Sequence, residues 1–146
     1  MKQRLLFVLV TIVLLLSLSA VSAQEPVELK FTIWSANEGH LAMLNGFAEA
    51  YKETHPHVSV VFETIPFADY ASTLTLRLAG SNPPDMGWLA ERMALTFIDA
   101  GVLTDLAPAL QAAEGYDLAD FSPAALGLWS AGEAVYGIPF STSPGF

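Results

Sequence analysis

The apolar and polar positions after residue 27 follow two different periods. Polar and apolar residues alternate over residues 28–34, and β-forming residues dominate residues 58–64, so both segments are predicted strands. Between them, apolar residues recur three and four positions apart over residues 38–54, which predicts an amphipathic helix. Pro56 ends this helix, because proline lacks the backbone N–H that a helix interior needs.

The same alternation of strands and helices continues toward the C-terminus. The later predicted elements are a helix that opens at Phe67 and closes at Gly80-Ser81-Asn82, a short strand at 85–89, helices at 91–100 and 105–113, and a strand at 135–140. This strand–helix order is βαβαβ, which predicts an α/β fold with a mostly parallel sheet covered by helices. We expect strand 28–34 to lie between strands 58–64 and 85–89.

The first 23 residues have the pattern of a signal peptide. Lys2 and Arg4 precede an apolar run at residues 5–16, and Val21-Ser22-Ala23 resembles a cleavage site. We expect cleavage after Ala23, which leaves residues 24–146 as the mature chain. The alternative is an uncleaved membrane anchor, because residues 5–23 are nearly long enough to span a bilayer.

The amino-acid composition argues against some classes of partner and indicates the cellular compartment. After cleavage four basic residues remain against fifteen acidic ones, and no basic cluster exists, which argues against binding nucleic acid. The chain has no cysteine, so it has neither disulfides nor an N-terminal cysteine for lipid attachment. We therefore expect a periplasmic or secreted protein that is not inserted in the membrane after cleavage.

Candidate ligand-binding residues follow the carboxyl ends of two predicted strands. In an open parallel sheet, ligands bind beyond these ends, where the strand order reverses. A tryptophan at this edge suits a carbohydrate, because a sugar ring stacks on indole while its hydroxyls bond to carboxylates and amides. The candidates are Ser35, Asn37 and Glu38 after the first strand, and Trp88 and Glu91 after the third.

Simpler roles remain open for several of these positions. Trp34 alternates with other apolar residues and equally suits the core. Asn37 and Glu38 suit the start of a helix, and Glu91 suits a first helical turn. His55-Pro56-His57 lacks a third metal ligand nearby, so we expect a solvated turn and no metal site. No catalytic constellation and no cofactor motif are present, so we expect neither catalysis nor a cofactor.

The order and spacing of six short motifs resemble the family 1 extracellular solute-binding proteins, the sugar-binding components of ABC importers. Each motif is loose alone, and together they span the mature chain. The motifs are Leu29–Trp34, Phe47–Tyr51, Pro56–Val60, Leu78–Gly80 with Pro84–Met86, Ala100–Leu106 and Val135–Ser143.

This resemblance implies two α/β lobes joined by a hinge, which close on a saccharide and deliver it to a membrane permease. It implies that residues 24–146 are the N-terminal lobe, without the second lobe. It also implies ligand contacts at Ser35, Asn37, Glu38, Trp88 and Glu91. The alternatives are another small polar solute such as a polyol or glycerol-phosphate, a secreted glycosidase fragment, and a membrane-tethered sensor domain.

Overall fold

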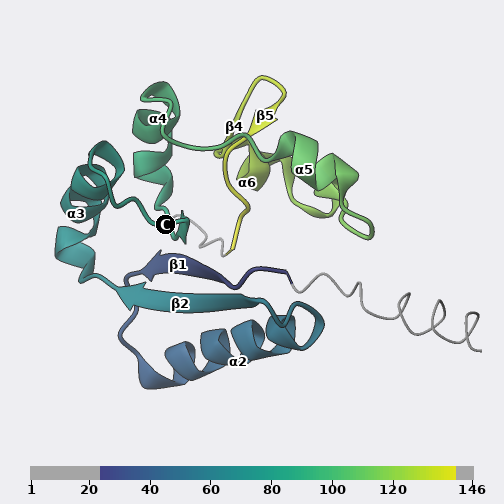
Figure 1. The fold of residues 1–146 in the computed structure, drawn as a ribbon. Helices are drawn as coiled ribbons and strands as arrows, with labels where there is room; N and C mark the ends of the chain where they lie inside the picture. Colours follow the sequence, from purple (N-terminus) through teal and green to yellow (C-terminus); the bar gives the residue numbers. More distant parts are fainter. Residues whose placement is uncertain (1–23, 141–146) are drawn as a thin grey trace, which may run out of the picture.

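The structure is a computed structural model that describes residues 24–140. The predicted signal peptide at residues 1–23 and the motif end at Ser141–Ser143 lie outside the described residues. None of the helices within residues 24–140 is long and apolar enough to cross a membrane. The elements are β1 (Val27–Ile33), α2 (Glu38–Thr54), β2 (Val58–Thr64), α3 (Phe67–Ala79), β3 (Met86–Gly87), α4 (Glu91–Asp99), α5 (Ala107–Ala112), the 3-10 helix η1 (Leu118–Asp120), α6 (Pro123–Gly127), β4 (Ser130–Ala131) and β5 (Ala134–Val135) (Figure 1).

β1 is the central strand of a three-stranded parallel sheet with the order β2-β1-β3. It pairs with β2 along its whole length and with β3 over two residues, where Phe31 and Thr32 lie opposite Met86 and Gly87. The predicted βαβαβ start and the central place of the first strand are both confirmed. Because all three strands are parallel, their carboxyl ends meet at one edge of the sheet.

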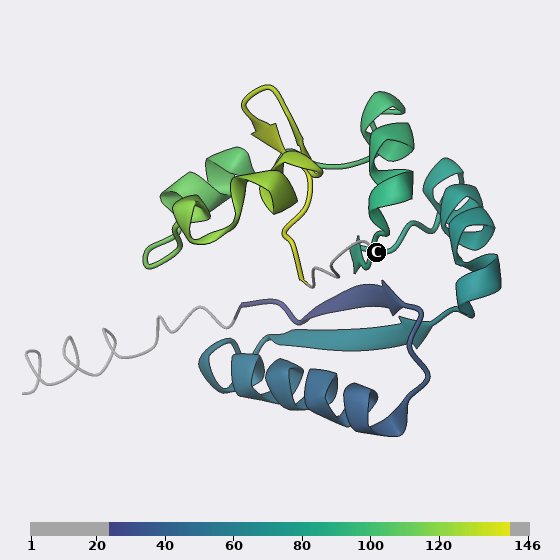
Figure 2. The ribbon, with the colours of Figure 1, turned by 180° about the vertical axis from the view of Figure 1, so that it is seen from behind.

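Helices cover both faces of this sheet (Figures 1 and 2). α2 lies along one face, where Leu44 is buried against the strands and the rings of Phe31 and Phe62 are 5.5 Å apart. α3 and α4 lie on the other face. The cover by α2 is incomplete, because Phe47 and Tyr51 remain exposed on the helix.

The main core lies where α3 and α4 pack together. The predicted apolar face of α3 is confirmed, because Tyr70 and Leu74 are buried and Leu78 packs against the core. Full burial of one side chain such as Leu74 contributes roughly 1.5–3 kcal/mol to folding. The buried cluster consists of Ile65, Tyr70, Leu74, Ala90, Met93 and Phe97.

The prediction of a strand at residues 135–140 is wrong. β5 ends at Val135 and pairs antiparallel with β4, and the residues up to Phe140 have no regular structure. Two features explain the difference: Gly132 adopts a φ of 63° in the two-residue turn between β4 and β5, and Pro139 lacks a backbone donor. The apolar residues therefore form a small hairpin and not a further strand of the sheet.

The segment between α4 and this hairpin was only partly predicted. The helix predicted at 105–113 is shorter and spans Ala107–Ala112, and η1 and α6 had no predicted counterpart. The side chain of Asp117 accepts a hydrogen bond from the backbone of η1, and Ser122 does the same for α6. Such one-turn helices are too short to leave an apolar period in the sequence.

Asp105 joins α5 to the hairpin, and its loss is expected to destabilise this part of the fold. Its Oδ1 atom accepts hydrogen bonds from Ala107 N at 2.9 Å and from Val135 N at 3.0 Å. We expect Asp105→Ala to lower the free energy of unfolding by about 1–2 kcal/mol, measured by urea denaturation. Asp99→Ala, an acidic residue at the end of α4 without such bonds, is the control and should change it by less than about 0.5 kcal/mol. Equal effects of the two variants would contradict this role for Asp105.

Candidate functional site

The residues that follow β1 and β3 lie side by side at the carboxyl edge of the sheet. The pairing continues past the two-residue strand β3, because Trp88 N donates to Thr32 O at 2.9 Å. The rings of Trp34 and Trp88 consequently meet edge to face, with centroids 5.1 Å apart. The structure thus brings together the two chain segments that the sequence singled out.

Trp34 is mainly a packing residue. It is half-buried and lies against the core cluster. Its ring meets Phe67 at 5.7 Å and Tyr70 at 5.2 Å between centroids, both edge to face. These contacts fit the simpler role that the sequence left open for Trp34.

Trp88 forms an aromatic platform with two residues that the sequence did not single out. The platform consists of His40, Trp88 and Phe140. The ring centroid of Trp88 lies 5.1 Å from that of His40 and 5.4 Å from that of Phe140, which stacks at an interplanar angle of 29°. Trp88 is half-buried, whereas Phe140 is 61% exposed, so the platform faces solvent. His40 lies in the first turn of α2, three residues after the N-cap Asn37. Phe140 is distant from Trp88 in the sequence, and no sequence pattern connects the two residues.

The loop after β1 brings polar groups close to this platform. Asn37 is the N-cap of α2, since its Oδ1 atom accepts from the backbone N of His40 at 3.0 Å. The backbone N of Asn37 donates to Ser35 Oγ at 3.4 Å. The Asn37 amide nitrogen has no protein partner among the described residues, so it can donate to a ligand while the oxygen caps the helix.

The two glutamates occupy equivalent places on different helices. Glu38 is the first residue of α2 and Glu91 the first residue of α4, and both side chains are exposed. Each carboxylate is favoured by the partial positive charge of its helix N-terminus. The two helices lie on opposite faces of the sheet (Figure 1).

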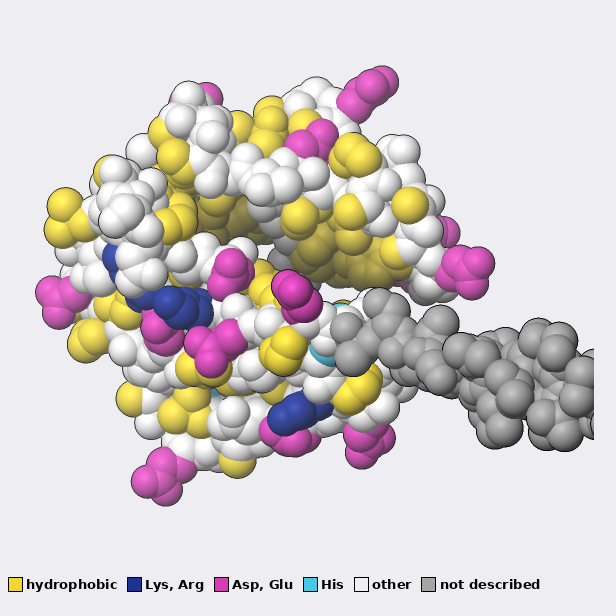
Figure 3. Space-filling view, in the orientation of Figure 1, with side chains coloured by type: hydrophobic (Ala, Val, Ile, Leu, Met, Phe, Trp, Pro, Cys, Tyr) yellow, Lys and Arg dark blue, Asp and Glu magenta, His cyan; other side chains and the backbone are white. Residues whose placement is uncertain are grey.

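An apolar hollow of about 280 Å³ adjoins the platform on the α2 side of the sheet. Figure 3 shows a second apolar surface, in the recess between the sheet and the segment from α5 to β5. The hollow on the α2 side is lined by Phe31, Leu44, Phe47, Ala48, Tyr51, Val60, Phe62, Met86, Trp88 and Phe140.

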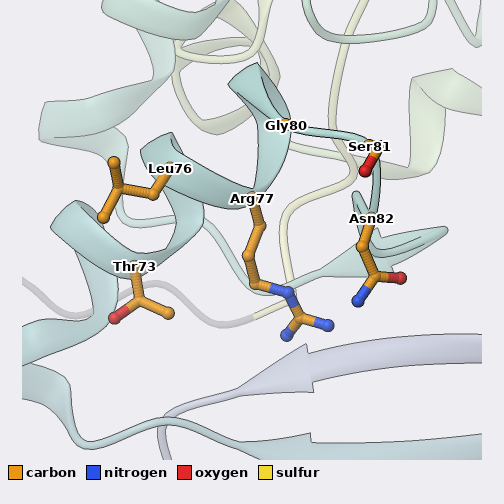
Figure 4. Close-up of a pocket in the computed structure, with 6 residues that line it drawn as sticks. All are labelled: Thr73, Leu76, Arg77, Gly80, Ser81 and Asn82. Carbon is orange, nitrogen blue, oxygen red and sulfur yellow. The ribbon is translucent and has the colours of Figure 1, made fainter.

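A separate hollow of about 310 Å³ lies at the end of α3, away from the platform, where the side chain of Arg77 extends from the helix (Figure 4). The Arg77 guanidinium lies 2.6 Å from Glu63 Oε2, an ion pair without good hydrogen-bond alignment. Because Glu63 neutralises this cation, the hollow lacks the charge of an anion site. Within residues 24–140, no three His, Asp or Glu residues are grouped as metal ligands.

Comparison with known proteins assigns the family. The sequence profile described as bacterial extracellular solute-binding protein matches residues 38–146, which is more than half of the chain. Comparison with curated proteins gives no significant match.

Several solved structures have the same fold as this chain. An ABC substrate-binding protein of Listeria monocytogenes, in complex with cycloalternan, superposes with a TM-score of 0.69 at 23% identity over 77% of this chain and 28% of its own. A periplasmic solute-binding protein of Pectobacterium atrosepticum superposes with a TM-score of 0.66 at 26% identity, over 79% of this chain and 27% of its own. The GacH receptor of Streptomyces glaucescens superposes with a TM-score of 0.62 at 21% identity, over 77% of this chain and 28% of its own.

The chain thus spans less than a third of the length of these structures. The part they share with it corresponds to one lobe of a periplasmic-binding-protein fold, with a parallel three-stranded sheet between helices. The family profile over residues 38–146 covers more than half of the sequence, and the chain therefore belongs to the bacterial extracellular solute-binding proteins.

Proposed function

We propose that residues 24–146 form the N-terminal lobe of a protein that binds a carbohydrate outside the cytoplasm and delivers it to an ABC importer, without catalysis. The observation that carries this proposal is the solvent-facing aromatic platform beside the polar groups of Asn37 and Ser35. A sugar ring has weakly polar faces and hydroxyls at its rim, so it needs both kinds of surface together. We propose that a second lobe follows this chain, and we use the term intact protein for the two lobes together.

Each candidate residue has a proposed task in this site. Trp88 provides the stacking surface, and His40 and Phe140 widen it. The Asn37 amide donates to a sugar hydroxyl, and Ser35, Glu38 and Glu91 complete the polar rim. Carboxylates accept strong hydrogen bonds from hydroxyl groups, which makes the two glutamates suitable for holding a neutral polyhydroxylated ligand.

The ligands of two structural neighbours support the choice of a saccharide. The Listeria protein was crystallised with cycloalternan, and the Streptomyces receptor was studied with acarbose and an acarbose homologue. Both ligands are carbohydrates. A polyol is the second candidate and uses the same hydroxyl chemistry. Glycerol-phosphate is less suited, because the proposed polar rim contains two carboxylates and Arg77 is paired with Glu63.

A glycosidase fragment is the alternative from another class, and the exposure of both candidate carboxylates argues against it, because a catalytic general acid sits in a desolvated pocket. Glycoside hydrolysis needs two carboxyl groups roughly 5–10 Å apart on either side of the scissile bond. Glu38 and Glu91 begin helices on opposite faces of the sheet, and both are exposed to water. Incubation of the intact protein with oligosaccharides is expected to release no products.

A thermal-shift screen of the intact protein against a saccharide panel, including cycloalternan and acarbose, tests the proposed function. A ligand that binds only the folded state raises the melting temperature in proportion to the logarithm of its concentration. We expect at least one saccharide to do so and charged solutes such as glycerol-phosphate to have no effect. A panel in which only polyols or phosphorylated solutes stabilise the protein would contradict the carbohydrate assignment.

We also propose that residues 1–23 are a cleaved signal peptide and that the mature protein is periplasmic or secreted. The basic start, apolar run and small residues before position 24 support this. N-terminal sequencing of the exported protein is expected to begin at Gln24. A sequence that begins at Met1 would instead indicate a membrane anchor. The permease of the importer is the proposed membrane partner.

A further inference from the structure

Tyr70 connects α3 to the backbone that carries Trp88. Its side chain is 1% exposed, and its Oη atom lies 2.7 Å from Trp88 O, 3.0 Å from Thr32 O and 3.0 Å from Thr32 Oγ1. The tyrosine ring does not belong to the aromatic platform. Instead, its edge-to-face partner is Trp34. Tyr70 therefore reaches Trp88 in two ways, directly through the hydrogen bond to its carbonyl and indirectly through the ring of Trp34.

The single phenolic proton of Tyr70 goes to Trp88 O. This is the shortest of its three contacts, and Thr32 O already accepts the backbone N–H of Trp88 at 2.9 Å. Thr32 Oγ1 then donates to Tyr70 Oη, which completes a chain of hydrogen bonds from β1 through α3 to the end of β3. Burial raises the pKa of the Tyr70 hydroxyl above its ordinary value, so the donor stays protonated at neutral pH.

The two hydroxyls of this network pack closely against Gly87. A Cβ atom at Gly87 would lie 2.4 Å from Thr32 Oγ1 and 3.1 Å from Tyr70 Oη. The two hydroxyls thus pack directly against the main chain one residue before Trp88. Thr32 is fully buried, and its Oγ1 atom also lies 3.4 Å from Met86 O in β3.

We propose that Tyr70 is a positioning residue that fixes the direction of the Trp88 indole by holding the Trp88 carbonyl. This inference rests on the proposed saccharide function, in which Trp88 is the stacking surface. Without the bond, α3 would no longer hold the main chain at Trp88, and a shift of this main chain would carry the indole with it. A misaligned indole stacks less well on a sugar, because binding depends on groups held in place beforehand.

The test uses ¹⁹F NMR of the intact protein labelled with 5-fluorotryptophan, with the Trp88 resonance assigned from a Trp88→Phe variant. Tyr70→Phe removes only the hydroxyl. We expect it to shift or broaden the Trp88 resonance in the ligand-free protein and to weaken binding of acarbose, or of the saccharide found in the panel, by roughly three- to tenfold. Leu74→Val is the matched control, since Leu74 lies one turn further along α3 in the same core. It should lower the melting temperature and leave both the Trp88 resonance and the affinity unchanged.

A second pair of variants tests the network without altering Tyr70. Thr32→Val removes the hydroxyl that bonds to Tyr70, and Thr32→Ser keeps it. We expect only the valine variant to disturb the Trp88 resonance. A folded Tyr70→Phe protein with an unchanged Trp88 resonance and affinity would overturn the proposal, as would equal effects of the two Thr32 variants. If the wild-type protein binds no saccharide but Tyr70→Phe still shifts the resonance, the proposed function fails and the positioning role stands.

Discussion

Trp88→Ala is expected to weaken saccharide binding by the intact protein by roughly thirtyfold or more, measured by isothermal titration calorimetry. A half-buried tryptophan at the centre of a site is the kind of residue that carries most of the binding free energy, typically about 2 kcal/mol or more when truncated. In this protein Trp88 stacks with Phe140 and contacts the tilted ring of His40, so its removal also releases its two neighbours. The platform would lose its central ring.

Two control variants separate this effect from a general loss of structure. Trp88→Phe keeps an aromatic ring and should retain most of the affinity. Leu95→Ala removes a side chain that is 68% exposed on α4 and should change neither affinity nor stability. Trp88→Ala with wild-type affinity for the saccharide would show that the platform is not the binding surface.

Gly87→Ala is expected to destabilise the fold by about 2–3 kcal/mol, measured by urea denaturation at a fixed temperature. The new Cβ atom would lie 2.4 Å from Thr32 Oγ1, a distance at which one of the two groups must move. Thr32 and Tyr70 are both almost fully buried and bonded to each other, so neither can move without breaking the network. Overpacking of this kind typically costs about 1–3 kcal/mol, and a lost buried hydrogen bond adds to it.

Gly46→Ala provides the matched control within the same protein. Gly46 lies inside α2, and a Cβ atom there would have no neighbour within 4 Å. Because alanine favours a helix over glycine by up to about 1 kcal/mol, Gly46→Ala should stabilise the protein slightly. If Gly87→Ala proved as harmless as Gly46→Ala, the close packing at the end of β3 would be contradicted.

The sheet order and the longer helices could be predicted from the sequence because their signals are local and repeated. The alternation over residues 28–34 and the helical period over residues 38–54 each extend over several residues, and the structure places β1 and α2 within one residue of these limits. Among the candidate site residues, the sequence predicted the structural role of Asn37, because asparagine suits the start of a helix and Asn37 does cap α2. Its proposed role in binding remains a prediction.

The platform and the hydroxyl network could not be predicted, because they depend on contacts between distant segments. Phe140 lies about fifty residues after Trp88, and its apolar neighbours suggested a strand that the structure lacks. Gly132 is the sequence signal for the hairpin, since glycine at the first position of a two-residue turn is typical of one. Tyr70 was assigned to one face of its helix by its spacing, but nothing in the sequence indicated where its hydroxyl points.

We propose that this chain contributes one lobe of a two-lobed clamp. A clamp gains affinity by surrounding its ligand and burying most of the ligand's surface in a closed cleft, whereas a single lobe leaves the outer hydroxyls of the sugar in water. The most direct measurement is titration calorimetry of residues 24–146 alone, beside the intact protein, with the saccharide that stabilises the intact protein. We expect micromolar or tighter binding to the intact protein and none, or millimolar binding only, to residues 24–146. Micromolar binding to residues 24–146 would mean that this lobe is a complete site and would contradict the claim.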